Sequence, residues 1–321
     1  MTIGIPKALL YYQYGVLWKS FFAGLSCDVV VSDNTNEAIF LDGSRDSISE
    51  CCLPAKVYLG HVRFLRNRCD YILSPYVDKK KGGDAICTRF WGMGDVIRHT
   101  YPSVKLLEYA IYDDNAKSQY KNFRNIGKQL GKRSALIRDA YEAATEAQSL
   151  YDKKLREAQS YLLSYPGLKI MLTGRPYVMH DPYIGGPVVN ILSELGISAF
   201  FSDRFDRRDT LSHSVDISPR LYWTANREAI GAIATYKNSI DGVLMLTAFP
   251  CAQDALACEM ASRVVDGIPI SIILLDGLQG EAGLQTRIES FIDILSERKT
   301  YSERRAASHF VPTHGQLSYN D

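Results

Sequence analysis

Short apolar runs alternate with longer amphipathic stretches along most of the chain. Four runs in the first third have the length and apolar character of buried strands, at residues 2–6, 27–32, 70–75 and 103–108. Stretches with helical spacing of apolar residues lie around 8–24, 54–67 and 92–99. This alternation predicts a parallel sheet covered by helices on both faces.

A second alternation of the same kind begins at residue 168. Its predicted strands are residues 168–174, 196–202, 241–247 and 268–276, and its predicted helices lie near 187–195, 220–237, 254–265 and 281–297. Between the two alternations, residues 116–165 are polar and carry charges at helical spacing, which indicates a helical connector. The residues from about Arg298 onward are polar and basic, and we expect a weakly ordered tail there.

The predicted fold class is therefore α/β, with two Rossmann-like parallel-sheet domains and a helical connector. We expect a first α/β domain at 1–115, the connector at 116–166, a second α/β domain at 167–297 and the tail at 298–321. Ligands of open parallel sheets bind outside the carboxyl ends of the strands. The cleft between the two sheets is therefore the expected site.

Composition and charge narrow the function classes. The 321 residues are 46% apolar and 23% charged, which is ordinary for a globular protein. Thirty-seven basic residues nearly balance thirty-six acidic residues, so the overall charge favours neither nucleic acid nor an anionic membrane as a partner. The amino-terminal residues lack the pattern of a secretory signal, and no apolar run has the length of a membrane span, so we expect a cytoplasmic protein.

Seven cysteines are the main candidates for chemistry. They are scattered and odd in number, so metal binding or redox chemistry is favoured over disulfides. The alternative is that they are small buried apolar residues. We prefer that alternative for Cys27 and Cys69, because each begins an apolar strand, and we expect the strand of Cys27 to be interior.

Three of the cysteines come directly before predicted helices. Cys52 precedes Pro54, Cys87 precedes the helix around 92–99, and Cys251 follows the apolar run at 240–246. A helix amino terminus favours a thiolate, and we expect this at Cys52. The three positions are 35 and 164 residues apart, so only the tertiary fold could bring them together. Three thiolates with one open position suit an iron–sulfur cluster, whereas structural zinc typically has a CxxC pair, which is missing near them. Spacing alone leaves both the cluster and buried structural cysteines open.

Several stretches together resemble the 2-hydroxyacyl-CoA dehydratase and activase-associated family, related to double-cubane cluster proteins. These stretches are IGIPKALLYY (3–12), CLPAKVYLGHV (52–62), GRPYVMHDPYIGGP (174–187), FPCAQDALACE (249–259) and EAGLQTRIESFIDIL (281–295). The resemblance implies three cysteines that hold a 4Fe-4S or double-cubane iron–sulfur cluster, and by position they are Cys52, Cys87 and Cys251. Cys51 and Cys258 are spare thiols beside them. The sequence departs from the family at Ala252 and Gln253, where relatives often have glycine and proline, and it is similar only loosely around Cys87.

The resemblance also implies a function. Proteins of the 2-hydroxyacyl-CoA dehydratase type receive electrons from a separate ATP-dependent activase for a low-potential reduction or dehydration. The chain has no GxxxxGK[ST] phosphate loop, and only the weak turn-like segment DGS at 42–44, so the activase would be a separate partner. A homodimer or a heterodimer with a related subunit is expected. The alternatives are a non-catalytic cluster carrier or partner subunit, and an α/β scaffold that holds no cluster.

Other side chains have two interpretations each. Arg175, Tyr177 and His180 point into the cleft in one interpretation and belong to a structural loop in the other. For His61 a hydrogen-bonded helix position is preferred over a ligand role, and for Glu259 a salt bridge is preferred over acid chemistry. The lysines at 79–81 suggest a solvated loop.

Overall fold

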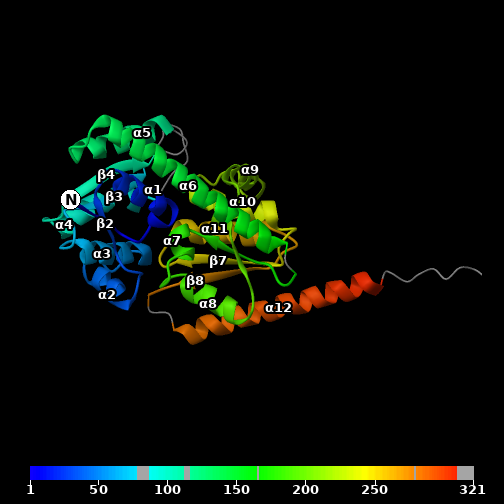
Figure 1. Cartoon of the computed structure of the whole chain (residues 1–321). Helices are drawn as coiled ribbons and strands as arrows, with labels where there is room; N and C mark the ends of the chain where they lie inside the picture. The colour runs from blue at the N-terminus through cyan, green and yellow to red at the C-terminus, as the bar shows by residue number, and fades with distance from the viewer. Residues whose placement is uncertain (78–86, 112–115, 165, 278–279, 309–321) are drawn as a thin grey trace, which may run out of the picture.

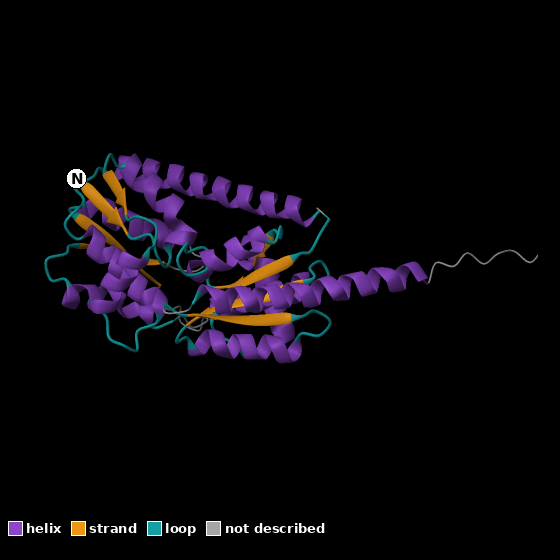
Figure 2. Ribbon diagram, turned by 90° about the horizontal axis from the view of Figure 1, so that it is seen from below, coloured by secondary structure: helices purple, strands orange, loops and turns teal. Residues whose placement is uncertain are grey.

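The computed structural model describes residues 1–77, 87–111, 116–164, 166–277 and 280–308. Within these ranges the chain forms two four-stranded parallel sheets with helices packed around them (Figure 1). Figure 2 shows the two sheets in separate parts of the molecule. The prediction of an α/β fold with two Rossmann-like parallel sheets is confirmed. The loop around the lysines at 79–81 lies outside the described residues.

The first sheet has the strand order β2-β1-β3-β4. Its strands are β1 (Thr2–Ile5), β2 (Asp28–Val31), β3 (Tyr71–Val77) and β4 (Leu106–Ile111). The intervening helices are α1 (Tyr11–Gly24), α2 (Glu37–Arg45), α3 (Leu53–Leu65) and α4 (Arg89–Thr100). Cys27 comes just before β2, which is an edge strand and not the expected interior strand, although its thiol is buried.

The second sheet repeats this order as β6-β5-β7-β8. Its strands are β5 (Ile170–Gly174), β6 (Ala199–Phe201), β7 (Gly242–Ala248) and β8 (Ile270–Leu275). The helices among them are α7 (Pro176–Met179), α8 (Gly186–Glu194), α9 (Arg207–Ile217), α10 (Thr224–Tyr236) and α11 (Ala252–Val264), with a short 3-10 turn at Ser202–Arg204. Because the two sheets have the same strand order, a loop that follows a strand of the first sheet corresponds to a loop that follows the equivalent strand of the second.

Two helices connect the sheets, as the polar stretch predicts. These are α5 (Ala116–Gln129) and the 30-residue α6 (Ser134–Leu163). α6 packs on α1, and at the middle of α6 Gln148 Oε1 accepts a hydrogen bond of 2.9 Å from the backbone N–H of Leu17. Near its end Gln159 bonds both the backbone N–H and the carbonyl of Phe201 in the second sheet, at 2.8 and 3.1 Å. One long helix therefore braces both sheets.

The last helix, α12 (Glu281–Ser308), is longer than predicted. It continues past Arg298, so the expected tail begins inside a helix, and residues 309–321 lie outside the described part. Figure 1 shows α12 running along the second sheet and then away from the body. No described helix combines the length and the apolarity needed to cross a membrane.

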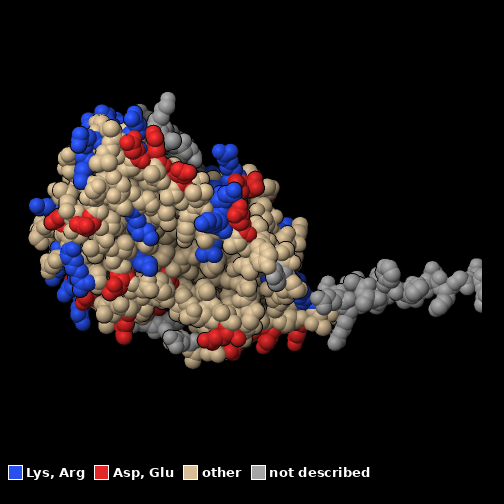
Figure 3. All heavy atoms as spheres, viewed as in Figure 1, with Lys and Arg blue, Asp and Glu red and all other residues tan. Residues whose placement is uncertain are grey.

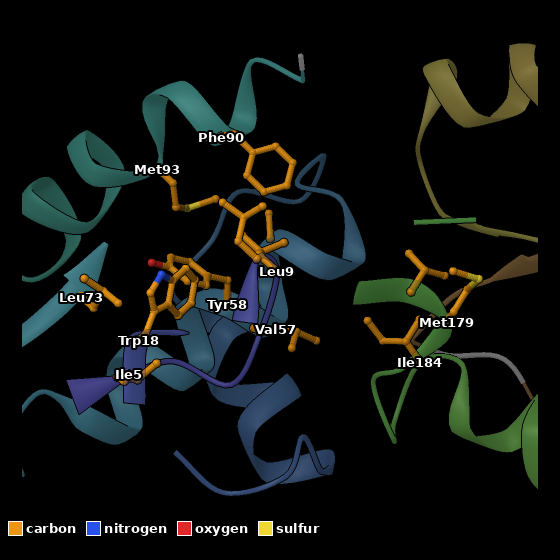
Figure 4. Close-up of a cluster of buried hydrophobic side chains, with 14 of the residues drawn as sticks. Ile5, Leu9, Trp18, Val57, Tyr58, Leu73, Phe90, Met93, Met179 and Ile184 are labelled. Atoms are coloured by element: carbon orange, nitrogen blue, oxygen red, sulfur yellow. The ribbon is translucent and has the colours of Figure 1, made fainter. Parts of the chain in front are cut away.

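A hydrophobic cluster extends from the first sheet to one face of the second. It includes Trp18 and Tyr58 on the first side and Met179 and Ile184 on the second (Figure 4). A separate cluster fills the other face of the second sheet, and alternate residues of β7 belong to each: Leu244 to the first cluster and Met245 to the second. This period of two is the expected signature of a strand buried on both faces.

Candidate functional site

The three predicted cysteines lie where the sequence places them relative to helices. Cys52 and Cys251 are the N-cap residues of α3 and α11, and Cys87 lies two residues before α4. Pro54 in the first turn of α3 suits a helix start, because its fixed φ is helical and it needs no hydrogen-bond partner there. All three thiols are half-buried.

The fold brings these cysteines to one cavity of about 210 Å³. Cys52 and Cys87 reach it from the first sheet, and Cys251 reaches it from the end of β7 in the second. A backbone hydrogen bond of 3.0 Å from Leu53 N to the carbonyl oxygen of Phe249 joins the two cysteine loops directly. Among the described residues that line the cavity, these are its only cysteines. Residues far apart in sequence therefore share one site at the carboxyl ends of two sheets.

The side chains around the cavity can be compared with the needs of a metal ion. In the described part of the chain, no three His, Cys, Asp or Glu side chains converge closely enough to hold one metal ion. A mononuclear site needs that convergence, since Zn–S bonds are about 2.3 Å long. An iron–sulfur cluster binds each cysteine through a different iron, so its thiolates stand further apart. In the described part of the chain, the three thiols therefore line one cavity without forming a ready-made site for a single ion.

Burial is the main influence on the pKa values of two of the thiols, Cys52 and Cys251. Removal from solvent raises the pKa of Cys52 despite a backbone hydrogen bond from the first turn of α3 and the nearby Arg89, both of which lower it. Burial and the charge of Asp254 raise the pKa of Cys251 to about 12. The expectation of a thiolate favoured at Cys52 is therefore wrong for the ligand-free protein, because desolvation disfavours the charged form.

Arg175 forms the polar wall of the cavity. It is the N-cap residue of α7, and its side chain is almost fully buried. Its Nε donates to Asp254 Oδ1 at 2.8 Å, and its Nη2 donates to Asn226 Oδ1 at 2.7 Å and to Gln253 Oε1 at 3.0 Å. Gln253, where the sequence departs from the family pattern, thus holds the arginine beside Cys251.

Two neighbours of Arg175 have different positions. Tyr177 also lines the cavity, and its ring contacts that of Phe90 edge-on at 5.8 Å between centroids. His180 is directed elsewhere: its Nε2 lies 2.8 Å from Asp203 Oδ2, and its ring packs against Phe201. The cleft interpretation therefore applies to Arg175 and Tyr177, and the structural interpretation applies to His180.

The remaining cysteines have structural surroundings. Cys27, Cys51 and Cys258 are buried, and Cys69 Sγ lies 3.3 Å from the carbonyl oxygen of Leu65. Cys258 packs inside α11, as expected from its place two turns beyond Cys251.

For His61 and Glu259 the preferred structural interpretations are confirmed. His61 is fully buried between the hydroxyls of Ser32 and Thr35, at 2.8 and 3.0 Å. Glu259 forms an exposed salt bridge with Arg263 one helical turn away. Neither residue lines the cysteine cavity.

Sequence reasoning missed the residues that fix Arg175. Asp254 lies in the first turn of α11, and Asn226 lies in α10, with its Nδ2 2.8 Å from Asp254 Oδ1. The available signal was Asp254 itself, an acidic residue three positions after Cys251, in a first helical turn where carboxylates are common. That commonness also hid its role as the partner of a distant arginine.

Comparisons with known proteins give one family. No curated protein matches the chain. Structures similar over most of the chain include a crystal structure of ZnuA, at 11% identity and a TM-score of 0.26, with 91% of this chain and 98% of that chain covered. A ZnuA variant lacking residues 138–173, with zinc bound, gives 12% identity and a TM-score of 0.27, with 91% and 95% covered. TM-scores of this size support no conclusion about fold or zinc binding. The family described as "CoA enzyme activase uncharacterised domain" matches residues 2–205, which is more than half of the chain, and the chain therefore belongs to that family.

Proposed function

We propose that this protein binds an iron–sulfur cluster through Cys52, Cys87 and Cys251 and receives electrons from a separate ATP-dependent activase. The cluster would supply low-potential electron transfer for the reduction or dehydration of a small substrate. Membership in a family named for CoA enzyme activases supports the link to an activase.

One observation carries the proposal. Cys52, Cys87 and Cys251, which the family resemblance selects, line the same cavity although 35 and 164 residues separate them in sequence. Seven cysteines are present, and the four others lie in different surroundings. A shared cavity is expected for three ligands of one cluster, and ordinary core packing does not require it.

The residues around the cavity suit a buried redox centre. The three half-buried thiols share this lining with the buried apolar side chains of Val178 and Ala248. Arg175 contributes a fixed positive charge, although Asp254 at 2.8 Å balances much of it. Burial and hydrogen bonding are among the factors through which a protein sets a cluster's potential.

Exposed apolar side chains near the cysteines support docking of a protein partner. Trp91 is 58% exposed four residues after Cys87, and Phe249 is 50% exposed two residues before Cys251. Large aromatic side chains are enriched in protein interfaces. A related subunit or the activase is the partner that fits the proposed role. The DGS segment lies inside α2 and forms no phosphate turn, which is consistent with an ATPase on another chain.

Iron analysis of cysteine variants tests the ligand set. After anaerobic reconstitution, we expect bound iron and sulfide in the wild-type protein and in Cys27→Ala. Loss of most of the iron is expected in Cys52→Ala, Cys87→Ala and Cys251→Ala, because each removes one of three ligands. Cys258→Ala is a second control, since this buried thiol lies in the same helix that follows Cys251. Equal iron content in all variants, or none in the wild type, would refute the proposed site.

A second measurement separates the enzyme from a non-catalytic carrier. Reduction of the loaded protein by an activase and ATP is followed by electron paramagnetic resonance, and turnover is then assayed with a 2-hydroxyacyl-CoA substrate. Reduction with turnover supports the dehydratase-like role. Reduction without turnover assigns the chain to the carrier or partner-subunit role instead.

A further inference from the structure

A second cavity lies at the end of α3 opposite Cys52. It has a volume of about 360 Å³, compared with 210 Å³ for the cysteine cavity, and lies between the start of α2 and the end of α3. Its charged and aromatic lining residues are Asp42, Arg63, Phe64, Arg66 and Arg68. Cys52 and Arg66, which cap the two ends of α3, are 14 residues apart, or roughly 20 Å at 1.5 Å per residue. The cavity is therefore a separate place on the molecule.

Arg63 is already matched by carboxylates. Its Nη1 donates to both oxygens of Asp46, at 2.9 and 2.8 Å, and its Nε lies 3.7 Å from Asp42 Oδ2. Asp46 also accepts a hydrogen bond from the hydroxyl of Tyr101. Arg63 thus forms a fixed polar wall, with little charge left for a ligand.

Arg66 and Arg68 have a different environment. In the described part of the chain neither forms a salt bridge, and both are exposed. The guanidinium of Arg68 lies over the ring of Phe64 at 3.6 Å, and that of Arg66 lies 5.8 Å from the ring of Tyr101. A cation–π contact uses the face of a guanidinium and leaves the N–H donors at its edge available. The two arginines are therefore held in place with unused donors.

We propose that this cavity binds the phosphate groups of a small molecule through Arg66 and Arg68. The planar forks of two arginines match phosphate oxygens, which they bind bidentately. With Arg63 matched by Asp42 and Asp46, Arg66 and Arg68 leave the lining positive although the chain as a whole is nearly neutral. Basic side chains also gather along the edge of the molecule beside α2, α3 and α4 in Figure 3. The concave shape favours a small ligand over a flat protein surface.

Titration calorimetry with inorganic phosphate, pyrophosphate and ADP tests this site on the cluster-free protein. We expect saturable binding, tighter for pyrophosphate than for phosphate because two arginines can each meet one phosphate group. Arg66→Gln and Arg68→Gln should each weaken pyrophosphate binding about tenfold, since each removes a charge-assisted contact. ADP that binds more tightly than pyrophosphate indicates a nucleotide as the ligand, and equal binding indicates the phosphate groups alone.

Two further variants sharpen the test. Arg263→Gln removes an exposed arginine of α11, far from the cavity lining, and should leave binding unchanged. Asp42→Asn removes the acidic residue of the lining and should tighten pyrophosphate binding several-fold, the opposite sign to the arginine variants. The proposal is overturned if the wild type shows no saturable phosphate binding, if Arg66→Gln and Arg68→Gln bind like the wild type, or if a polyglutamate peptide binds more tightly than pyrophosphate.

Discussion

Arg175 shows how one side chain connects the stability of the fold to the candidate site. Its guanidinium is buried, and its bonds to Asp254, Asn226 and Gln253 account for its position beside Cys251. A buried ion pair contributes little net stability, because removing both charges from water costs about what their attraction returns. Leaving one charge without its partner is the costly event.

Asp254→Ala is therefore expected to lower the free energy of unfolding by about 3–5 kcal/mol. Urea denaturation of the cluster-free protein measures this change. Glu259→Ala, which breaks the exposed pair with Arg263 on the same helix, should cost only about 0–1 kcal/mol. Similar losses in the two variants would show that burial does not set the strength of the Arg175 pair.

The close contact between α2 and α3 requires glycine at two positions. A Cβ atom built on Gly43 would lie 1.8 Å from the carbonyl oxygen of Lys56, and one built on Gly60 would lie 1.9 Å from that of Ile39. Backbone atoms cannot move aside as the end of a flexible side chain can. The two glycines therefore allow the close approach that positions α3, with Cys52 at its start.

Gly43→Ala and Gly60→Ala are each expected to destabilise the protein by about 1–3 kcal/mol, because the added methyl group forces α2 and α3 apart. Gly92→Ala in α4 is the matched control, since no atom beyond its own stretch of helix backbone lies within 4 Å of the added Cβ. There the substitution should stabilise the protein by up to about 1 kcal/mol through helix propensity. Thermal or urea unfolding gives all three values, and a loss at Gly92 equal to that at Gly60 would contradict the packing argument.

Sequence periodicity predicted the strands well because each is a short apolar run between polar segments. All eight strands appear within a few residues of their predicted positions, including β7, buried along its whole length. Three described helices escaped prediction, the four-residue α7 and, for local reasons, α2 and α9. In α2 the DGS segment suggests a turn, and α9 contains several serine and aspartate residues that favour turns and caps. Packing against α3 and α10 overrides these preferences.

A buried polar network connects the two halves of the molecule. Asp181, which follows α7, accepts hydrogen bonds from the hydroxyls of Thr35 and Tyr12 at 2.5 and 2.9 Å. Because the Thr35 proton is directed to Asp181, its oxygen accepts from His61 Nε2, and His61 Nδ1 accepts from Ser32. This pattern requires a neutral His61. Burial and the charge of Lys7 accordingly lower the pKa of His61 to about 3.

The free energy of unfolding should therefore decrease as the pH is lowered below about 6.5, the pKa that His61 has in the unfolded chain. Between that value and about 3 the unfolded state binds a proton that the folded state does not, so acidification favours unfolding. From pH 7 to 5.5 the contribution of His61 to the loss is about 1 kcal/mol. His61→Gln should lack this part of the pH dependence, measured as the difference between urea unfolding curves. Burial also raises the pKa of Asp181, which acts in the opposite direction, so the difference between the wild type and His61→Gln isolates the contribution of His61.

The candidate site was only partly predictable from the sequence. Cys52, Cys87 and Cys251 could be selected because a resemblance and their places before helices marked them. Asn226, Asp254 and the Tyr12–Asp181 contact could not, since each joins residues dozens to more than a hundred positions apart. Such pairs leave no local periodicity, and only the assembled sheets bring them together.

The cysteine cavity draws its thiols from both sheets, and this has a consequence for how the chain can be divided. The stretch matched by the family ends at residue 205, so it contains Cys52 and Cys87 but not Cys251. A fragment cut at that boundary would keep two thiols and lose the third, together with Asp254, which holds Arg175 in place. Neither sheet alone therefore forms the cavity. Strand β7 and helix α11 are as necessary to it as the matched residues 2–205.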